Sequence, residues 1–490
     1  MSRYDVLFLG SSPNALAAAA RLGRAGLRVL VLETRGTAGG PVATEEFAPG
    51  FRADTGVMSA SLDPEIMREL GVSIDVIRRD SVTALGPEPS TLRALPELPE
   101  AVSQAIELLR AVYRSEPPEM PAPPGADLAV LHDLGARLAG FGARPMHEVL
   151  RLLFMSARDF FEEQVGSGAA RAVLCGAAVR ALSEGPFAQG TLFGFLHHAA
   201  VDDGLFRCTA KGGLGALVGA LAEVARAAGV EIRIGVPGPL QVEVEDGTAR
   251  GVRLGDGERI AAEIVVSDHD ARTTFTKLVQ PRELDPETNR ALRAVRYRGS
   301  VARVHLALRG APELTGVDPD ALRGTLVLAP DVASIERAWD QAKRGAVPSR
   351  PYVEISVPTA SDPTLAPEGQ HVLDAWVQYV PYGRADRQAV LKSVLDLLAP
   401  LAPGLQELLL HHHVSLPEDL ERRFGLPEGQ LYGGEIRLEQ AFFLRPIPGY
   451  SHYESPIANL YLGGSAAHPG GYSGRSGWNL AGRLLGRRAS

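Results

Sequence analysis

The sequence predicts an α/β protein with a Rossmann-type dinucleotide-binding domain that carries a three-stranded β-meander, and with an inserted α+β domain. Three observations predict this fold class. A strand, a glycine turn and a helix open the chain and lead to a second strand by residue 33. Three alternating strands separated by Asp-Gly turns follow at 241–268. A strand, a glycine-rich loop and a helix close the chain at 458–486.

Length and composition limit the possible classes of protein. With 490 residues the chain exceeds what one hydrophobic core usually organises, which predicts two domains. Apolar residues make up 45% and charged residues 22%, as in globular proteins. The net charge of −8 disfavours nucleic acid as a partner. Two cysteines, Cys175 and Cys208, cannot build a disulfide framework, a cysteine zinc site or a C-x-x-C redox pair.

The N-terminal segment has the pattern of a βαβ unit. Tyr4–Leu9 is predicted as a buried strand, 13–25 as an alanine-rich helix and 28–33 as a second strand. About 30 residues is the length expected for one mononucleotide-binding half of a dinucleotide fold. The apolar run in the first strand is too short for a signal peptide and leads into Gly10-Ser-Ser-Pro, which is no cleavage site.

The middle of the chain returns to alternating helix and strand. Residues 211–234 predict a glycine-opened helix that ends at Gly229, followed by a strand. The segments QVEVEDG, TARGVRLGDG and ERIAAEIVVSD then predict three strands joined by Asp246-Gly247 and Asp256-Gly257 turns. A meander of this kind usually accompanies a Rossmann domain that binds FAD, and it is absent from a plain dehydrogenase domain.

The remaining segments predict a second domain. We expect the FAD-binding domain to combine residues 1–80, 205–275 and 430–490. Residues 81–204 and 276–429 would form a substrate or helical cap domain, because the first of them is mostly helical and the second mixes helices with strands. These strands are predicted at 301–308, 352–357 and 371–379, with a helix at 387–399. Residues 40–60 resemble a loop.

The turn Gly10-Ser-Ser-Pro-Asn-Ala15 lies between the first strand and the first helix. Dinucleotide folds place glycine at three positions of this turn, for the tight turn, for approach of the pyrophosphate and for helix packing. Here Gly10, Ser12 and Ala15 occupy those positions. The side chain of Ser12 intrudes where phosphate oxygens sit, although its hydroxyl is able to donate a hydrogen bond to them. Pro13 and Asn14 complete the predicted phosphate-binding turn.

Two further features extend the nucleotide site. Glu33 ends the second strand, where a carboxylate accepts hydrogen bonds from both ribose hydroxyls of an adenosine and repels a 2′-phosphate. The alternative is a solvated acid at a strand end. The residues after Glu33 are predicted to form a second loop whose backbone runs beside the pyrophosphate. The alternative is a simple glycine turn. This loop contains Thr34, Arg35, Gly39, Gly40, Pro41 and Val42.

Three collinear blocks resemble one family. The opening through GGPVATEEFAPGFRADTG, the segment KGGLGALVGALAEVARAAGVEIRI with the meander, and the C-terminal QAFFLRPIPGYSHYESPIANLYLGGSAAHPGGYSGRSGWNLAG are similar to phytoene-desaturase-like FAD-dependent oxidoreductases. Within that group the chain is most similar to the branch of pyridine nucleotide-disulfide oxidoreductase domain-containing proteins. The resemblance covers the whole chain, with only general similarity at 85–200 and 310–420.

The resemblance implies non-covalent FAD. It puts Gly464 and Ser465 beside the pyrophosphate and ribitol, and it places His468, Pro469, Gly470, Gly471 and Tyr472 along the flavin edge. The glycine pair suits backbone that passes close to a flat ring. The chain departs from the family pattern at Ser12, Ala15 and Tyr472, where glycine is usual, and GGEIRLEQ (433–440) lacks a histidine often found there.

The favoured function is FAD-dependent desaturation, dehydrogenation or isomerisation of a lipophilic, isoprenoid-like small molecule by hydride transfer to flavin. His468 and Tyr472 are the catalytic candidates, by position alone. One alternative is a flavin-fold protein that binds lipid or protein without redox chemistry, which Ser12 and Tyr472 motivate. Another is an amine or amino-acid oxidase, in which Arg445 would meet a substrate carboxylate; pairing of Arg445 with a structural acid is the equal alternative.

The remaining candidates predict no metal site. His197-His198 lie in an apolar helix and are interpreted as core or surface residues. His411-His412-His413 is interpreted as a loop feature, since no carboxylate or cysteine clusters with it. Because no apolar segment reaches the length of a membrane span, we expect a cytoplasmic protein with at most peripheral membrane contact. The sequence leaves the oligomeric state open.

Overall fold

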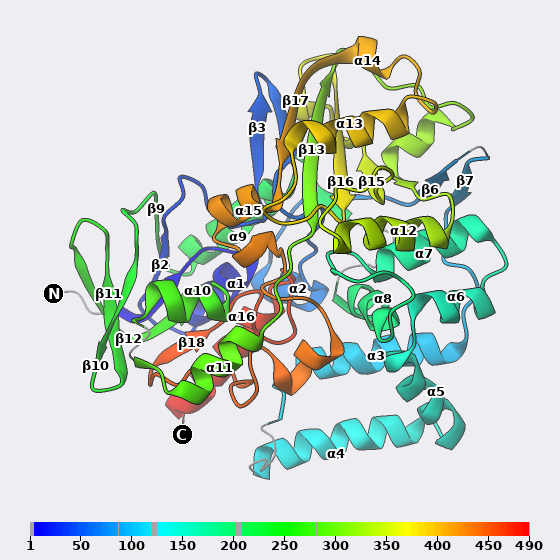
Figure 1. The fold of residues 1–490 in the computed structure, drawn as a ribbon. Helices are drawn as coiled ribbons and strands as arrows, with labels where there is room; N and C mark the ends of the chain where they lie inside the picture. Colours follow the sequence, from blue (N-terminus) through cyan, green and yellow to red (C-terminus); the bar gives the residue numbers. More distant parts are fainter. Residues whose placement is uncertain (1–3, 87, 119–124, 202–207, 281–282, 490) are drawn as a thin grey trace.

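The computed structural model describes residues 4–86, 88–118, 125–201, 208–280 and 283–489. Two sheets form the two ends of the molecule, and a group of helices lies beside the second sheet (Figure 1). The N- and C-terminal ends both lie at the first sheet (Figure 1). This arrangement confirms the predicted fold class, a Rossmann-type sheet with a meander plus a separate mixed α/β unit.

The first sheet combines strands from the start, the middle and the end of the chain. In spatial order it contains β10 (Gln241–Glu245), β11 (Thr248–Arg253), β12 (Arg259–Ser267), β1 (Tyr4–Leu9), β2 (Val29–Glu33) and β9 (Glu231–Ile234), with β18 (Leu460–Leu462) also paired to β12. Strand β12 ends the antiparallel meander and runs parallel to β1. The carboxyl ends of β1, β2, β12 and β18 therefore meet at one edge of the sheet.

The second sheet has seven strands and is mostly antiparallel. Its order is β17 (Leu409–Ser415), β13 (Val301–Leu308), β16 (His371–Gln378), β15 (Val353–Ser356), β14 (Thr325–Leu328), β6 (Val82–Leu85) and β7 (Ser90–Leu92). Every residue of β13 is buried, because helices cover the sheet and β17 closes its edge. Two small pairs complete the strands, β3 (Thr44–Ala48) with β4 (Phe51–Asp54) and β5 (Val76–Arg78) with β8 (Cys208–Ala210).

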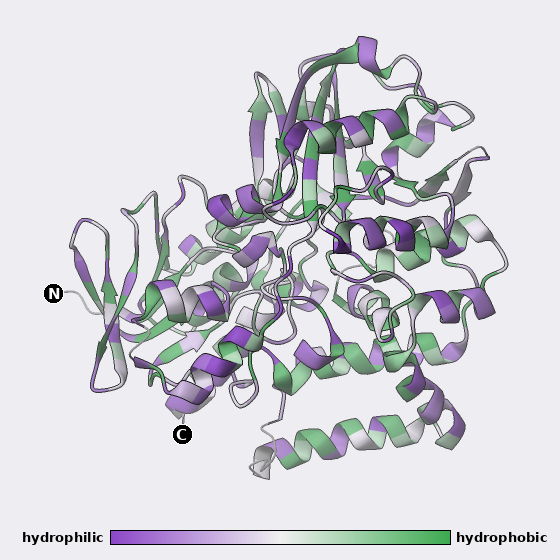
Figure 2. Cartoon of the chain, viewed as in Figure 1, coloured by the Kyte–Doolittle hydropathy of each residue, from purple (hydrophilic) through white to green (hydrophobic). Residues whose placement is uncertain are grey.

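The helices fall into three groups. Helices α1 (Pro13–Arg24), α9 (Leu214–Ala227) and α16 (Arg475–Ala489) pack together beside the first sheet, near α2 (Pro64–Leu70), α10 (Ala271–Thr273) and α11 (Pro286–Ala294). The lateral group contains α3 (Glu100–Arg114), α4 (Gly125–Gly140), α5 (Ala143–Phe154), α6 (Ala157–Gln164), α7 (Gly168–Ala178) and α8 (Thr191–Val201). Helices α12 (Val332–Lys343), α13 (Arg387–Leu398), α14 (Leu405–Leu408) and α15 (Pro417–Phe424) belong to the second sheet. Hydrophobic segments run through the strands of both sheets, whereas α11 and α12 are largely hydrophilic (Figure 2).

Two local predictions were wrong. Residues 40–60 contain the β3–β4 hairpin, which the scattered glycines and prolines concealed. The three histidines lie in β17 and not in a loop, since the backbone of 411–413 pairs with β13. Strand β17 is at the edge of the sheet, and the neighbouring residues His411 and His412 are both exposed, so the segment lacks the apolar alternation that marks a strand with one buried face.

Every helix among the described residues is too short or too polar to cross a lipid bilayer. The first sheet takes its strands from 4–33, 231–267 and 460–462, and the second sheet from 82–92 and 301–415. The division of the chain into domains at 80, 204, 275 and 429 stays a prediction.

Candidate functional site

The turn between β1 and α1 has the backbone of a dinucleotide-binding turn. Gly10 has a φ of +106°, which only glycine adopts without strain, and its N–H donates to the carbonyl of Leu32 at 2.8 Å. Ser12 is the N-cap of α1, and its hydroxyl accepts from the N–H of Asn14 at 3.2 Å. Pro13 takes the first helical position and Ala15 is buried. The positive end of the helix dipole therefore points at the predicted pyrophosphate position.

Glu33 lies beside this turn at the carboxyl end of β2 and is 6% exposed. Its carboxylate accepts from the hydroxyl of Ser11 at 2.6 Å and from the N–H of Arg35 at 3.0 Å. A carboxylate has about four lone-pair sites, so two hydrogen bonds leave acceptor capacity for ribose hydroxyls. The fixed orientation contradicts the alternative of a solvated strand-end acid, although the ribose role itself stays a prediction.

The second loop is tied to the first. The N–H of Gly39 donates to the hydroxyl of Ser11 at 3.0 Å, and the guanidinium of Arg35 donates to the carbonyl of Gly40 at 2.6 Å. Arg35 also pairs with Glu45 on β3 at 2.8 Å. Within this loop Pro41 and Val42 are buried and Thr34 is exposed. The structure thus holds the two predicted nucleotide loops side by side.

The C-terminal block completes the ring of loops. Gly464 and Ser465 follow β18, and a side chain at Gly464 would collide with the backbone of Asp268 after β12. The amide of Asn14 donates to the carbonyl of Gly471 at 2.9 Å, which connects the first turn to the C-terminal loop. Residues from both ends of the chain therefore meet at one edge of the first sheet.

The residues present fit FAD at this edge. A side chain at Gly40 or Gly471 would meet no heavy atom of the described residues within 4 Å, so both backbones border open space. Asn14 Oδ1 is buried and accepts no hydrogen bond from any described residue. The buried acceptor of Glu33, the helix N-terminus at Ser12 and these two glycines supply what an adenosine, a pyrophosphate and a flat ring require. These assignments of individual residues stay predictions.

One charged residue was missed by the sequence analysis. The carboxylate of Asp268 accepts from the N–H of Ser12 at 2.7 Å and from its hydroxyl at 2.6 Å. Burial raises the pKa of Asp268 to about 7, although both hydrogen bonds from Ser12 lower it, and the charge of Glu33 adds to the rise. An internal carboxylate thus lies on the helix N-terminus, where the pyrophosphate is predicted. Asp268 directly follows β12, and β12 pairs in parallel with β1, so their carboxyl ends lie together. An acid at the end of the third meander strand was the signal in the sequence.

We expect Asp268 to make FAD affinity depend on pH. Its carboxyl is neutral below a pH of about 7 and anionic above it, so the affinity of the apo-protein for the anionic pyrophosphate should fall as pH rises through that value. Asp268→Asn should bind FAD about tenfold more tightly at a pH of about 8.5 and lose this pH dependence. FAD fluorescence titrations at several pH values measure both effects. Asp256→Asn, in an exposed turn, is the control, and a flat wild-type profile would contradict the prediction.

His468 lies in a buried aromatic cluster with α3. Its ring centroid is 5.7 Å from that of Tyr113, and its Nε2 donates to the carbonyl of Val112 at 3.1 Å. Burial lowers the pKa of His468 to about 4, so the ring is neutral at pH 7. Nδ1 then carries the lone pair, and no described residue donates a hydrogen bond to it. A ring with so low a pKa is a weak base at pH 7, so Nδ1 is suited to accept a hydrogen bond, and the catalytic role of His468 stays a prediction.

Tyr113 also joins His197 of α8. The Tyr113 hydroxyl lies 2.8 Å from Nδ1 of His197. Burial raises the pKa of Tyr113 and lowers that of His197 to about 3, so the neutral tyrosine donates to the neutral histidine. Among the described residues no group of His, Cys, Asp and Glu is arranged to hold a metal ion. The sequence left His197 and His198 as core or surface residues, and their burial places both in the core. It missed Tyr113, because its partner His197 lies 84 residues away.

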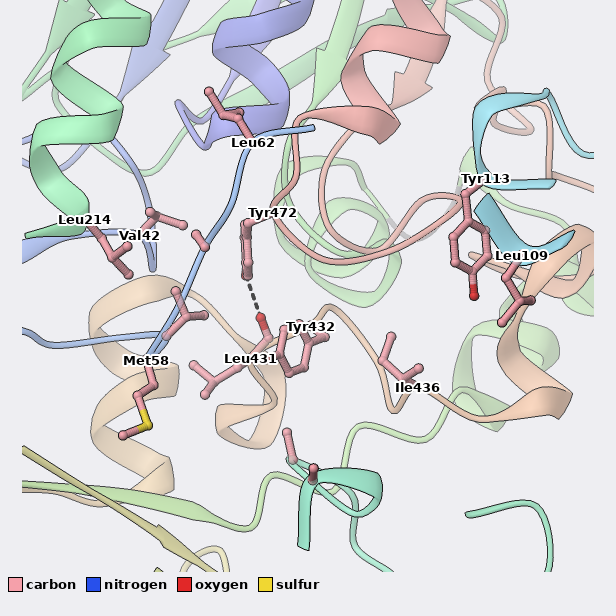
Figure 3. Packing of buried hydrophobic residues seen from close by; sticks show 14 of the residues in the cluster. Val42, Met58, Leu62, Leu109, Tyr113, Leu214, Leu431, Tyr432, Ile436 and Tyr472 are labelled. Carbon is pink, nitrogen blue, oxygen red and sulfur yellow. Dashed lines mark hydrogen bonds between the residues drawn. The ribbon is translucent and has the colours of Figure 1, made fainter. Parts of the chain in front are cut away.

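Tyr472 points away from the His468 cluster. Its hydroxyl donates to the carbonyl of Leu431 at 2.5 Å, and Val42 and Leu62 lie on the other side of its ring (Figure 3). Tyr113 lies on the opposite side of Ile436 in the same view (Figure 3). Burial raises the pKa of Tyr472, so the phenol is neutral. The two catalytic candidates are therefore not brought together as one acid–base pair.

The structure contradicts one of the two roles expected for Arg445, pairing with a structural acid, and contact with an anionic substrate group stays a prediction. Its guanidinium is 3% exposed and donates to the carbonyls of Tyr432, Ser465 (3.0 Å) and Gln440 (3.3 Å). No acid among the described residues pairs with it, and its terminal nitrogens are engaged with backbone. Arg445 therefore fixes the backbone of the C-terminal block. It also packs close to Gly470, since a Cβ at that position would lie 3.2 Å from Arg445 Nε.

Comparisons with known proteins agree with this geometry. Residues 16–484 match the family model described as "Flavin containing amine oxidoreductase". The "Pyridine nucleotide-disulfide oxidoreductase domain-containing protein 2" of Rattus norvegicus is 29% identical over 98% of this chain and 92% of its own. The "zeta-carotene-forming phytoene desaturase" of Myxococcus xanthus is 26% identical over 95% and 90%. The crystal structure of an oxidoreductase from Methanosarcina mazei superposes with a TM-score of 0.63 at 16% identity, covering 98% of this chain and 100% of the other.

The family model spans almost the whole chain, from α1 to α16, and begins directly after the Gly10–Ala15 turn. The resemblance to the phytoene-desaturase-like group and the predicted cofactor are confirmed by these matches. The chain belongs to the flavin containing amine oxidoreductase family and is an FAD-dependent oxidoreductase.

Proposed function

We propose that the chain dehydrogenates an apolar organic substrate at the flavin. The observation that carries this proposal is a cavity of about 420 Å³ bordered by α2, α3, α8 and the C-terminal loop. Its lining is mainly apolar and includes Leu62, Met67, Ile74, Val201 and Leu217. Cavities of this size and character hold small ligands.

The cavity reaches the C-terminal loop. Pro469 and Ser473 line it; Pro469 belongs to the segment predicted to border the flavin ring, and Ser473 directly follows that segment. Tyr113 lines it as well and contacts His468 through its ring. When bound, FAD supplies a hydride acceptor for a substrate carbon. The chain contributes an apolar wall that excludes water and, behind Tyr113, the neutral ring of His468, whose Nδ1 accepts no hydrogen bond from a described residue.

An amine substrate is less compatible with this cavity. Arg110, Arg114 and Arg475 line it and Asp63 is its only carboxylate among the described residues. A cationic amine would be repelled by this excess of positive charge. Arg445 donates to backbone carbonyls with both terminal nitrogens, so only its buried Nε is left for the carboxylate of an amino acid.

An anaerobic screen of the FAD-loaded protein tests the proposal. Isoprenoid, fatty and amine compounds are added in turn, and flavin reduction is followed as loss of absorbance near ~450 nm. We expect reduction by an apolar compound and none by simple amines. Reduction by amines or amino acids alone would contradict the proposal and support an amine oxidase.

A binding protein without redox activity is the second candidate. Asp268 on the helix N-terminus and the buried ring of Tyr472 beside the predicted flavin edge favour it, since both take space or charge near the cofactor. If the loaded protein binds an apolar compound and no compound reduces the flavin, this second function is supported.

A further inference from the structure

Two neighbouring cavities share a wall. The apolar cavity of about 420 Å³ adjoins a polar cleft of about 730 Å³, and Pro64, Arg114 and Arg475 line both. Arg475 begins α16 and Pro64 begins α2. The two spaces are therefore adjacent parts of one depression, apolar on the side of the C-terminal loop and polar on the side of α16.

The polar cleft has an excess of positive charge. Four arginines and two glutamates line it, in a protein whose net charge is −8. One of these glutamates, Glu116, pairs with Arg483 outside the lining at 2.8 Å. Glu65 is shared between Arg475 at 2.9 Å and Arg114 at 3.7 Å. Arg68 pairs with Glu69 outside the lining at 3.6 Å. The uncompensated positive charge is therefore that of Arg21 and of Arg114, which shares Glu65 with Arg475, and it attracts an anion.

Arg475 stands at the shared wall. It is 4% exposed, and one of its terminal nitrogens pairs with Asp63 at 2.6 Å and with Glu65 at 2.9 Å. Its Nε is buried and donates to no described residue. Burial lowers the pKa of the nearby Arg21, and the charge of Arg475 lowers it further. Two carboxylates already pair with a terminal nitrogen of Arg475, so the donor that it offers to an acceptor with negative charge is the buried Nε, near the guanidinium of Arg21.

Arg110 extends this charge to the rim of the apolar cavity. Its guanidinium donates to the carbonyl of Ala199 at 3.0 Å, and no carboxylate among the described residues pairs with it. Arg114 lies one helical turn further along α3, and its side chain is 54% exposed. Both side chains therefore have donors available to a ligand.

We propose that this depression binds an amphipathic anion, with its carboxylate or phosphate among Arg110, Arg114 and Arg475 and its apolar chain extending toward Pro469. The inference rests on the proposed function and narrows its substrate class from apolar compounds to apolar chains that end in an anionic group. The apolar lining holds the chain, and the arginines fix its orientation, so that the same carbon is presented to the flavin edge.

Calorimetric titration of the FAD-loaded protein with dodecanoate and with dodecan-1-ol tests the charge requirement. At low ionic strength the acid should bind at least about tenfold more tightly than the alcohol, and added salt should reduce this difference. Arg110→Gln and Arg114→Gln should each weaken dodecanoate binding about tenfold and leave dodecan-1-ol binding unchanged. Leu217→Trp, which fills the apolar cavity, should weaken both ligands.

Arg137→Gln, on the exposed face of α4, is the matched control and should bind both ligands like the wild type. Vesicles of phosphatidylglycerol and of phosphatidylcholine distinguish a free acid from a membrane lipid. Binding of dodecanoate that depends on the arginines indicates a free acid. Binding of phosphatidylglycerol vesicles alone that depends on the arginines indicates a membrane lipid. Equal affinity for acid and alcohol, or unchanged affinity in both arginine variants, would overturn the proposal.

The two proposals fail separately. Arginine-dependent binding of dodecanoate without flavin reduction by any compound would support the anion site and contradict the redox function. Flavin reduction by a neutral apolar compound, with no preference for the acid, would leave the function intact and exclude the anion site.

Discussion

Asp374→Ala is expected to lower the free energy of unfolding by about 3 to 5 kcal/mol. Arg303 on β13 has a fully buried side chain, and its terminal nitrogen lies 2.7 Å from both carboxylate oxygens of Asp374 on β16. Removing the carboxylate would leave a buried guanidinium without its counter-charge, because its other hydrogen bond goes only to the carbonyl of Gly56. Gly56 lies just after β4, so the hydrogen bond from Arg303 also attaches the segment after β4 to the second sheet.

The same pair predicts loss of stability in acid. Burial alone would raise the pKa of Asp374, but the charges of Arg303 and His305 outweigh it and hold this pKa well below its usual range. A lowered pKa in the folded state stabilises the protein above the pKa of the unfolded chain, about 3.9, and this contribution is lost as pH falls toward the folded-state value.

Urea unfolding of the wild type and of Asp374→Ala measures the difference in the free energy of unfolding, and repeating it at lower pH measures the loss in acid. Asp396→Ala is the matched control, because Asp396 pairs with Lys392 on the exposed face of α13 and should contribute less than about 1 kcal/mol. A difference between Asp374→Ala and Asp396→Ala of less than about 1 kcal/mol would show that the buried pair has little net effect.

Glu33→Ala is expected to weaken FAD binding by about 2 to 3 kcal/mol, the loss of a pair of charge-assisted hydrogen bonds. The buried carboxylate is oriented by Ser11 and by the N–H of Arg35, so little side-chain entropy is lost when ribose hydroxyls bind. Fluorescence titration of the apo-protein with FAD gives the affinity.

Two comparisons separate the cofactor contact from local unfolding. Glu46→Ala removes an exposed carboxylate from β3 and should retain wild-type FAD affinity. Thermal melting of the apo-protein shows whether Glu33→Ala disturbs the loops before FAD is added. Wild-type FAD affinity in Glu33→Ala would exclude the ribose assignment.

Much of the fold follows from local patterns. The βαβ unit was predictable because β1 and β2 are short apolar runs with a glycine turn and an alanine-rich helix between them. The meander was predictable from Asp246-Gly247, which occupies the tight turn between β10 and β11. By contrast, the pairing of β6 with β14 joins residues more than 200 positions apart, and no local pattern encodes it.

The site shows the same division. Glu33 and the glycine loops lie close in sequence to the elements that position them, so their place could be inferred. Asp268 acts on Ser12 across 256 positions, and Tyr113 donates to His197 from another helix. The role of Arg445 also depended on tertiary contacts, because a guanidinium that binds backbone carbonyls has no signature in the sequence.

The absorbance spectrum of the purified protein, reconstituted with FAD at a pH of about 6 where Asp268 is neutral, tests the central claim most directly. We predict flavin bands near ~450 nm that remain after removal of free cofactor, about one flavin for each chain, and release of intact FAD on denaturation. A colourless protein under these conditions, or one that retains FMN in place of FAD, would contradict the assignment of an FAD site to the loops around Gly10, Glu33 and Gly471.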